Sequence, residues 1–236
     1  MINGGVLKMF QKVPIIRGFT EIEDLVEICE QFNAVICGGY VRYMCSPRKN
    51  PVQAKDVDVF PKSERSFNDL KQHFLEVKGF TVKHENNVSL TLEAPKGTIW
   101  EYCPVIQLIK PVKEGAIVTL GTLEEILENF DFTVVRAGLL SSTFALVDED
   151  FLSDEKKMVL RLKNIHCPVS SLLRCMKYGN KGYFLRPMEA MKLFMDWDNR
   201  SNEYKSQLVE FFDKSRTEDK WTREEIDQLE ALLRID

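Results

Sequence analysis

Apolar residues recur along the chain at helical spacing in some segments and at strand spacing in others. Apolar positions three or four residues apart predict helices over residues 22–32, 66–78, 123–130, 168–178, 187–197, 203–212 and 222–233. Short apolar or alternating runs predict strands over residues 34–37, 56–60, 80–82, 88–92, 98–102 and 105–109. This order predicts an α+β fold, in which a small mixed β-sheet is flanked by helices and followed by an α-helical C-terminal region.

Composition places the chain among ordinary globular proteins. Its 236 residues are 44% hydrophobic and 29% charged, and no apolar run approaches the ~20 residues that span a bilayer. The N-terminus lacks the pattern of a signal peptide, and the six cysteines form no C-x-x-C pair, so we expect a cytoplasmic protein with buried thiols and no membrane partner. A net charge of −4 argues against coating nucleic acid by bulk electrostatics but leaves room for a local basic groove.

The most informative stretch is a short apolar strand followed by a glycine pair. Gly38 and Gly39 come directly after the strand, and Arg42 lies in the first turn of the helix expected next. Glycines at such a turn let backbone N–H groups approach a phosphate, and the start of a helix favours negative charge. The stretch therefore predicts a phosphate-binding turn.

Two aspartates follow on a strand whose side chains alternate between its faces. Asp56 and Asp58 lie two residues apart, so their carboxylates face the same side. Adjacent carboxylates repel each other unless a cation lies between them, and Mg²⁺ binds through one or two carboxylates together with substrate phosphates. With the glycine pair, these residues predict a metal-dependent nucleotide site. The alternative is a plain turn beside a solvated acidic strand.

The glycine pair and the aspartate pair carry a resemblance to a known family. The series G-G-x-V-R followed by D-x-D resembles the signature of nucleotidyltransferases of the DNA polymerase β superfamily. Over roughly residues 30–180 the chain looks most like the head and neck of bacterial-type (class II) CCA-adding enzymes and poly(A) polymerases. The resemblance implies a catalytic head over residues 1–163 and a helical neck and C-terminal region over residues 164–236.

Glu101 is the candidate for a third carboxylate. It is the first acidic residue on an expected strand after the aspartate pair, and the resemblance places the family's third acidic residue on the corresponding strand. A third carboxylate would complete the metal site and assist deprotonation of an attacking hydroxyl. The alternative is an exposed strand glutamate.

A second motif, Asp131-Phe132-Thr133, extends the resemblance. It follows a helix that begins near Thr122 and precedes residues 144–148, where the family has a strand that ends in an aspartate. In the family this D-F-T aspartate helps to hold the incoming ribose, and the resemblance carries that role to Asp131. Arg174 and Lys177 match later basic positions of the family's neck helix. They share a helix face that either contacts phosphate or is solvated.

The chain also departs from the family. The family's arginine pair is Asn129-Phe130 here, and its base-selecting acid and arginine are Pro168 and Ser171. Arg136 supplies a positive charge near the first of these positions without occupying a family position. Triphosphate binding and base selection are therefore expected to differ in detail.

Two segments outside the motifs also bear on the structure. The loop over residues 45–55 carries several basic residues, including Lys55, and is either a plain connector or a contact with substrate. The methionines and aromatic residues over 187–197 form a stripe that is typical of core packing.

Together these features predict an enzyme that moves a nucleoside monophosphate from a nucleoside triphosphate such as ATP to an acceptor hydroxyl and releases pyrophosphate. The expected cofactor is Mg²⁺, as two ions, with Mn²⁺ as the alternative. The resemblance implies an RNA 3′ end, tRNA-like, as acceptor; a protein or small-molecule hydroxyl is the alternative. The second hypothesis is an inactive nucleotide-binding or protein-interaction module of the same fold, with the C-terminal helices as a partner surface.

Overall fold

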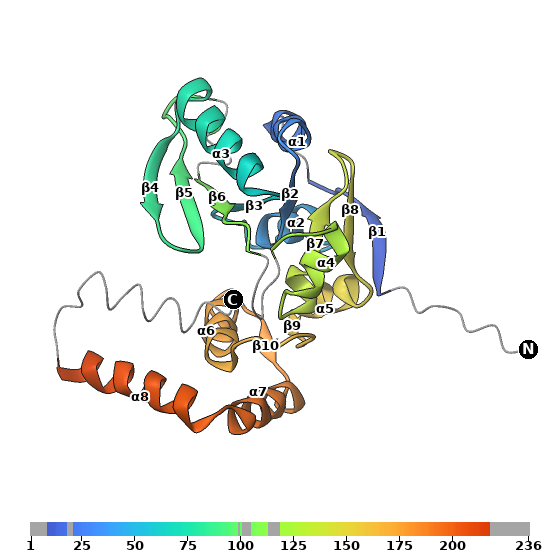
Figure 1. Cartoon of the computed structure of the whole chain (residues 1–236). Coiled ribbons are helices and arrows are strands. Elements are labelled where there is room, and N and C mark those ends of the chain that lie inside the picture. The colour runs from blue at the N-terminus through green and yellow to red at the C-terminus, as the bar shows by residue number, and fades with distance from the viewer. Residues whose placement is uncertain (1–8, 18–20, 99, 101–104, 113–118, 218–236) are drawn as a thin grey trace, which may run out of the picture.

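A mixed eight-stranded sheet forms the centre of the molecule in the computed structural model, which describes residues 9–17, 21–98, 100, 105–112 and 119–217 (Figure 1). Its strands are β1 (Phe10–Pro14), β2 (Ala34–Cys37), β3 (Val57–Pro61), β4 (Thr81–Glu85), β5 (Ser89–Glu93), β6 (Val105–Ile109), β7 (Ala137–Leu139) and β8 (Phe144–Asp148). They lie in the order β1-β8-β7-β2-β3-β6-β5-β4. Only β3 and β6 are parallel neighbours among these described strands; the other pairs are antiparallel.

Helices cover both faces of this sheet. The main core lies where α1 (Glu21–Gln31), α2 (Gly39–Cys45) and α3 (Glu64–Gln72) pack on residues such as Ile36 and Val59. A smaller cluster on the other face joins Cys37 and Phe60 to α4 (Leu123–Glu128). Because side chains alternate along a strand, Asp58 shares the face of Phe60 and α4. The structure confirms the predicted α+β class.

Local capping interactions explain why two of the predicted elements begin where they do. Thr122 and Glu125 form a reciprocal capping box at the start of α4, with the Thr122 N–H donating to the Glu125 carboxylate at 2.7 Å. In the hairpin between β4 and β5, the Asn86 carboxamide oxygen accepts hydrogen bonds from the N–H groups of Val88 and Ser89, each at 2.8 Å. The predicted helix start is therefore confirmed, and the hairpin turn is fixed by a side chain of its own.

The C-terminal part packs below the sheet (Figure 1). It contains α6 (Pro168–Gly179), β10 (Phe184–Leu185), α7 (Pro187–Asn199) and α8 (Asn202–Thr217). In the chain it follows α5 (Phe151–Lys157) and β9 (Val159–Leu160), and β9 pairs in parallel with β10. An apolar cluster joins residues on both sides of residue 163, among them Phe132, Tyr178 and Leu193. The division at residue 163 stays a prediction, and the cluster fixes α6 against the head. None of the described helices has the length and apolarity needed to cross a membrane.

The structure corrects the expectation of a buried methionine stripe. On α7 the side chains of Met188, Met191 and Met195 are exposed, as is Phe194, while Leu193 is buried. The four exposed residues lie on one side of the helix because their spacing follows the helical repeat. The core-packing prediction was therefore wrong for this segment, which presents an apolar face.

Two further differences concern the edges of the predicted pattern. Strand β1 was not predicted, and it ends in Pro14, a residue that an edge strand tolerates because it needs fewer backbone donors. The predicted strand over 98–102 falls largely outside the described residues, and the predicted helix over 222–233 falls wholly outside them. No disulfide forms among the described cysteines.

Candidate nucleotide and metal site

Gly38 occupies the turn between β2 and α2 and faces Asp58. Its backbone has φ +86° and ψ −144°, a conformation that residues with a side chain rarely adopt. A Cβ atom added there would lie 2.9 Å from Asp58 Oδ2. Gly38 is therefore required both for the turn and for the space beside the carboxylate. Its own N–H donates to the carbonyl of Ala137 at 2.7 Å, so the N–H of Gly38 is occupied within the sheet.

Asp58 lies in the middle of the sheet, opposite Cys37 of β2 and Gln107 of β6, and Asp56 immediately precedes β3. Within the described residues, no side-chain hydrogen bond or ion pair engages either carboxylate. Burial and the nearby charge of Asp56 raise the pKa of Asp58 to about 7, against the opposing effect of Lys177. The two carboxylates are therefore close enough to repel each other, as the sequence predicts.

This pair fits a hard divalent cation. Carboxylate oxygens are the ligands that Mg²⁺ prefers, and a cation would remove the repulsion that raises the pKa of Asp58. In the part of the chain that the structure describes, no cluster of three or more acidic, histidine or cysteine side chains could hold a metal. Glu101 lies outside the described residues, so its role as third carboxylate stays a prediction. Asp56 and Asp58 are the two described candidate ligands, a number that would suit an ion completed by water and phosphate.

Helix α6 brings positive charge to this site. Lys177 is exposed and acts electrostatically on Asp58. Lys181, just after the helix, is half-buried, and its Nζ lies 4.9 Å from the centroid of the Tyr178 ring. The Tyr178 hydroxyl lies 3.9 Å from the position of a Cβ on Gly39. Sequence reasoning missed Lys181 and Tyr178. The spacing of four residues between the two lysines was the signal that could have found the first of them.

Arg42 occupies a fully buried position beside the glycine turn. Its guanidinium pairs with Glu155 at 3.3 Å and donates to the Tyr183 hydroxyl at 2.9 Å and the Val52 carbonyl at 2.7 Å. Glu155 also accepts a hydrogen bond from Ser46 at 2.6 Å. These contacts tie α2 to α5 and to the loop after α2. Phosphate binding by Arg42 stays a prediction, since the contacts that the structure shows are all made to protein groups.

Asp131 and Arg174, both predicted to contact the nucleotide, instead contact each other here. The buried carboxylate of Asp131 accepts a hydrogen bond from Arg174 Nε at 2.8 Å. The pair joins the segment after α4 to helix α6. A ribose that bound to Asp131 would have to share this carboxylate with Arg174, and that role also stays a prediction.

Arg136 stabilises the end of α4. Its guanidinium donates to the carbonyls of Glu128 at 2.6 Å and Phe130 at 3.0 Å, and it pairs with the buried Asp148 at 3.4 Å. The Glu128 carbonyl belongs to the last turn of α4, where carbonyls lack intrahelical partners, and Phe130 lies two residues past the end of that helix. These contacts account for the burial of Arg136. They do not test its predicted role in nucleotide binding, which stays a prediction.

The fold is similar to that of solved tRNA-processing and CCA-adding enzymes, which is the resemblance that the sequence predicts. One similar solved structure, a tRNA-processing enzyme in an apo form, has a TM-score of 0.52 and 20% identity, covering 78% of this chain and 49% of that one. Another, the Bacillus stearothermophilus CCA-adding enzyme in complex with CTP, has a TM-score of 0.52 and 17% identity, covering 74% of this chain and 42% of that one. At these identities the likeness establishes the fold.

The chain belongs to the Gabija anti-defense 2 family, which matches residues 9–157. A curated relative named Gabija anti-defense 2, from Bacillus phage SPbetaL7, is 27% identical over 227 residues, or 89% of this chain. The alignment covers 52% of that relative, so the chain spans about half its length. The matched region contains the glycine turn and both aspartates.

Proposed function

We propose that this protein is a metal-dependent nucleotidyltransferase that moves a nucleoside monophosphate from a nucleoside triphosphate, ATP among them, to an acceptor hydroxyl. The observation that carries the proposal is the pair Asp56 and Asp58, which make no side-chain hydrogen bond or ion pair within the described residues. Gly38 lies closer to the Asp58 carboxylate than a residue with a side chain could, since a Cβ there would be 2.9 Å from Asp58 Oδ2. Two unpaired carboxylates at a glycine turn suit a site that is completed by a cation and a phosphate.

In the proposed reaction, the acceptor oxygen forms a bond to the α-phosphorus, the bond from the α-phosphorus to the bridging oxygen breaks, and pyrophosphate leaves with the electron pair. Asp56 and Asp58 would hold Mg²⁺, as two ions, or Mn²⁺, which when bound supplies neutralising charge to the phosphates and makes the acceptor hydroxyl more acidic. Glu101 is proposed as the third ligand and as the group that takes the hydroxyl proton. Gly39 lets the phosphates approach the start of α2.

The proposed acceptor is the 3′ end of a tRNA-like RNA, and the proposed location is the cytoplasm, where nucleotides and tRNA are both present. The support is at the level of fold: the similar structures include a tRNA-processing enzyme and a CCA-adding enzyme. Membership of the Gabija anti-defense 2 family further supports a role in counteracting the Gabija defence.

A second candidate function is a module of the same fold that acts by binding a nucleotide or a protein, without transfer. The observation that favours it is that three predicted nucleotide contacts are engaged inside the protein. Arg42 pairs with Glu155, and Asp131 pairs with Arg174. The exposed apolar face of α7 offers a surface for a protein partner in this case.

Transfer is tested by incubating the full chain with Mg²⁺, total tRNA and each of the nucleoside triphosphates labelled at the α-phosphate. The proposal expects label in RNA, lost in Asp58→Asn and kept in Asp69→Asn, which alters a partly exposed aspartate of α3 that pairs with Arg65. Label in protein would show that the RNA acceptor is wrong while the chemistry holds. Absence of transfer to either acceptor would contradict the proposed transfer activity.

The anti-defence role separates the two candidates in cells. Phage plating is measured on bacteria that carry Gabija and express the chain. If the chain protects the phage against Gabija, and this protection disappears in Asp58→Asn but not in Asp69→Asn, the result supports catalysis. Equal protection by the wild type and Asp58→Asn supports the binding module.

A further inference from the structure

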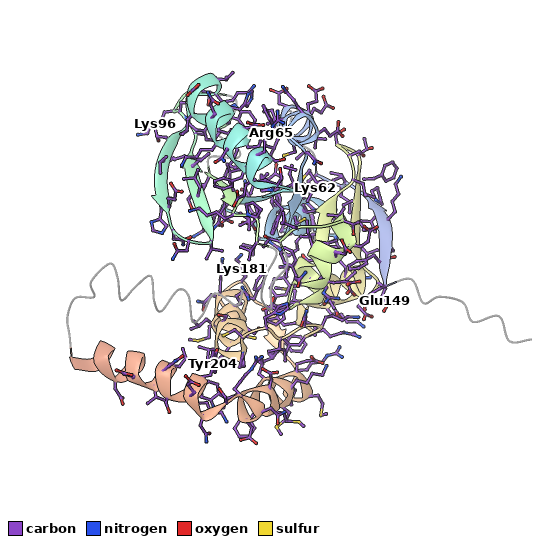
Figure 2. All side chains as sticks on the ribbon, in the orientation of Figure 1. Lys62, Arg65, Lys96, Glu149, Lys181 and Tyr204 are labelled. Atoms are coloured by element: carbon purple, nitrogen blue, oxygen red, sulfur yellow. The ribbon has the colours of Figure 1, made fainter. Side chains whose placement is uncertain are left out.

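Three lysines lie near the carboxylate pair without pairing to it. Lys177 acts electrostatically on Asp58, Lys181 is affected by the charges of Asp56 and Lys55, and Lys55 directly precedes Asp56. Lys55 lies in the loop before Asp56, while Lys177 and Lys181 come from the end of α6 (Figure 2 labels Lys181). Within the described residues, none of the three makes an ion pair with either carboxylate. Charges of both signs that stay unpaired in one place remain available to a metal cation and an anionic ligand.

The position of Lys181 is fixed by the end of α6. Its backbone N–H donates to the Tyr178 carbonyl at 2.9 Å, and its ammonium lies over the Tyr178 ring. That ring in turn packs against Phe132, at 6.2 Å between centroids, and against Tyr183, at 5.3 Å. The Tyr178 hydroxyl approaches Gly39. The ammonium is therefore held on an aromatic support that also borders the glycine turn.

The charges around Lys181 are mainly positive. Burial and the neighbouring charges of Arg42, Lys177 and Lys55 lower its pKa, while Asp56 opposes them. Lys177 and Lys181 are also four residues apart, where like charges repel. Arg42 already pairs with Glu155, so the excess positive charge resides on the lysines. An anion with several charges would relieve this repulsion.

We propose that Lys181, together with Lys177 and Lys55, binds the polyphosphate chain of the nucleotide opposite the carboxylates that hold the metal. This inference rests on the proposed function and adds residues to it, because Lys181 and Lys55 belong to neither of its motifs. Lysine suits the role as a compact, mobile cation that follows a phosphate chain. The lysines would grip the phosphates that leave as pyrophosphate.

The test measures binding of inorganic tripolyphosphate to the full chain in the presence of Mg²⁺, by calorimetry. Lys181→Met is expected to weaken binding about tenfold, which corresponds to about 1.4 kcal/mol. Lys181→Arg keeps the charge and is expected to stay within about threefold of the wild type. Lys96→Met is the matched control, because Lys96 is an exposed lysine that lies apart from Lys181 (Figure 2).

The inference is overturned if Lys181→Met binds tripolyphosphate as the wild type does, if Lys96→Met loses as much affinity, or if the wild type does not bind it. Thermal unfolding of each variant confirms that it is folded. The transfer assay keeps this result separate from the proposed function. If the wild type transfers nucleotide and Lys181→Met binds tripolyphosphate normally, the lysine site is ruled out and the proposed enzymatic activity stands. If tripolyphosphate binding depends on Lys181 but no transfer is detected, the proposed enzymatic activity is ruled out and the polyphosphate site stands.

Discussion

Gly38 and Asp58 lie so close that a single methyl group on the glycine would reach the carboxylate, with a Cβ-to-Oδ2 distance of 2.9 Å. The two residues come from different elements, the turn after β2 and the strand β3, which are antiparallel neighbours in the sheet. Their contact is therefore set by the sheet register, which pairs Cys37 with Asp58. Their close approach places the glycine turn directly against the carboxylate that is proposed to hold the cation.

Substitution of Gly38 tests this relationship. Gly38→Ala is expected to lower the free energy of unfolding by about 1–3 kcal/mol, because the residue has φ +86° and its new methyl group meets Asp58. Gly97→Ala is the matched control, since Gly97 also has a positive φ, +73°, but nothing within 4 Å of the added Cβ. Urea unfolding of both variants separates backbone strain from contact. Equal losses would show that the contact with Asp58 costs nothing.

Stabilisation by Mg²⁺ is expected to depend on pH. The pKa of Asp58 is raised to about 7, so its contribution to the stability of the metal-free protein is present at low pH and is lost as the pH rises through about 7. A cation binds the ionised carboxylate, so the increase in Tm on adding Mg²⁺ should grow from about pH 6 to about pH 8. Thermal unfolding with Mg²⁺ and with a chelator measures it. In Asp56→Asn the metal-free protein should lose less stability over this range, because the neighbouring negative charge is gone. A constant effect of Mg²⁺ across the range would contradict a site at Asp58.

The buried pair of Arg42 and Glu155 is expected to be strongly coupled. Removing either partner leaves a buried charge, so Arg42→Met and Glu155→Gln should each lower the free energy of unfolding by about 3–5 kcal/mol. The double variant should lose clearly less than the sum of the two. Chemical denaturation of the full cycle measures this coupling. Additive losses would mean that the two side chains act separately.

On the exposed face of α7, substitutions are expected to change the stability very little. Met191→Gln and Met195→Gln are expected to change the free energy of unfolding by no more than about 0.5 kcal/mol, since their side chains are 52% and 60% exposed. Leu193→Ala on the same helix should cost about 2–4 kcal/mol, because Leu193 is buried in the cluster with Phe132 and Tyr178. The same denaturation experiment compares them. A large loss in the methionine variants would show that the face is packed in solution.

The sequence allowed the fold class and the central motif to be predicted because both depend on local patterns. Strand β2, the glycine turn and strand β3 are specified by short apolar runs and by residue types with special backbone or charge properties. The helix start at Thr122 was predictable for the same reason, since its capping box spans four consecutive residues.

The partners of the charged residues could not be predicted in the same way. Arg42 and Glu155 are 113 positions apart, and Asp131 and Arg174 are 43 apart, so only the tertiary fold brings them together. The prediction that the methionine stripe of α7 packs in the core was wrong for a related reason. Helical spacing shows that apolar residues share a face, but it does not show whether another element covers that face. Lys181 enters the site because α6 ends beside the glycine turn, which no local pattern encodes.

Tyr178 restrains the position of the end of α6. Its ring is wedged between Phe132 and Tyr183, its hydroxyl borders Gly39, and Lys181 lies on top of it. The lysine-bearing end of α6 therefore cannot swing away from the acidic strand unless this ring is first displaced. One aromatic side chain thus fixes the end of α6 against the glycine turn.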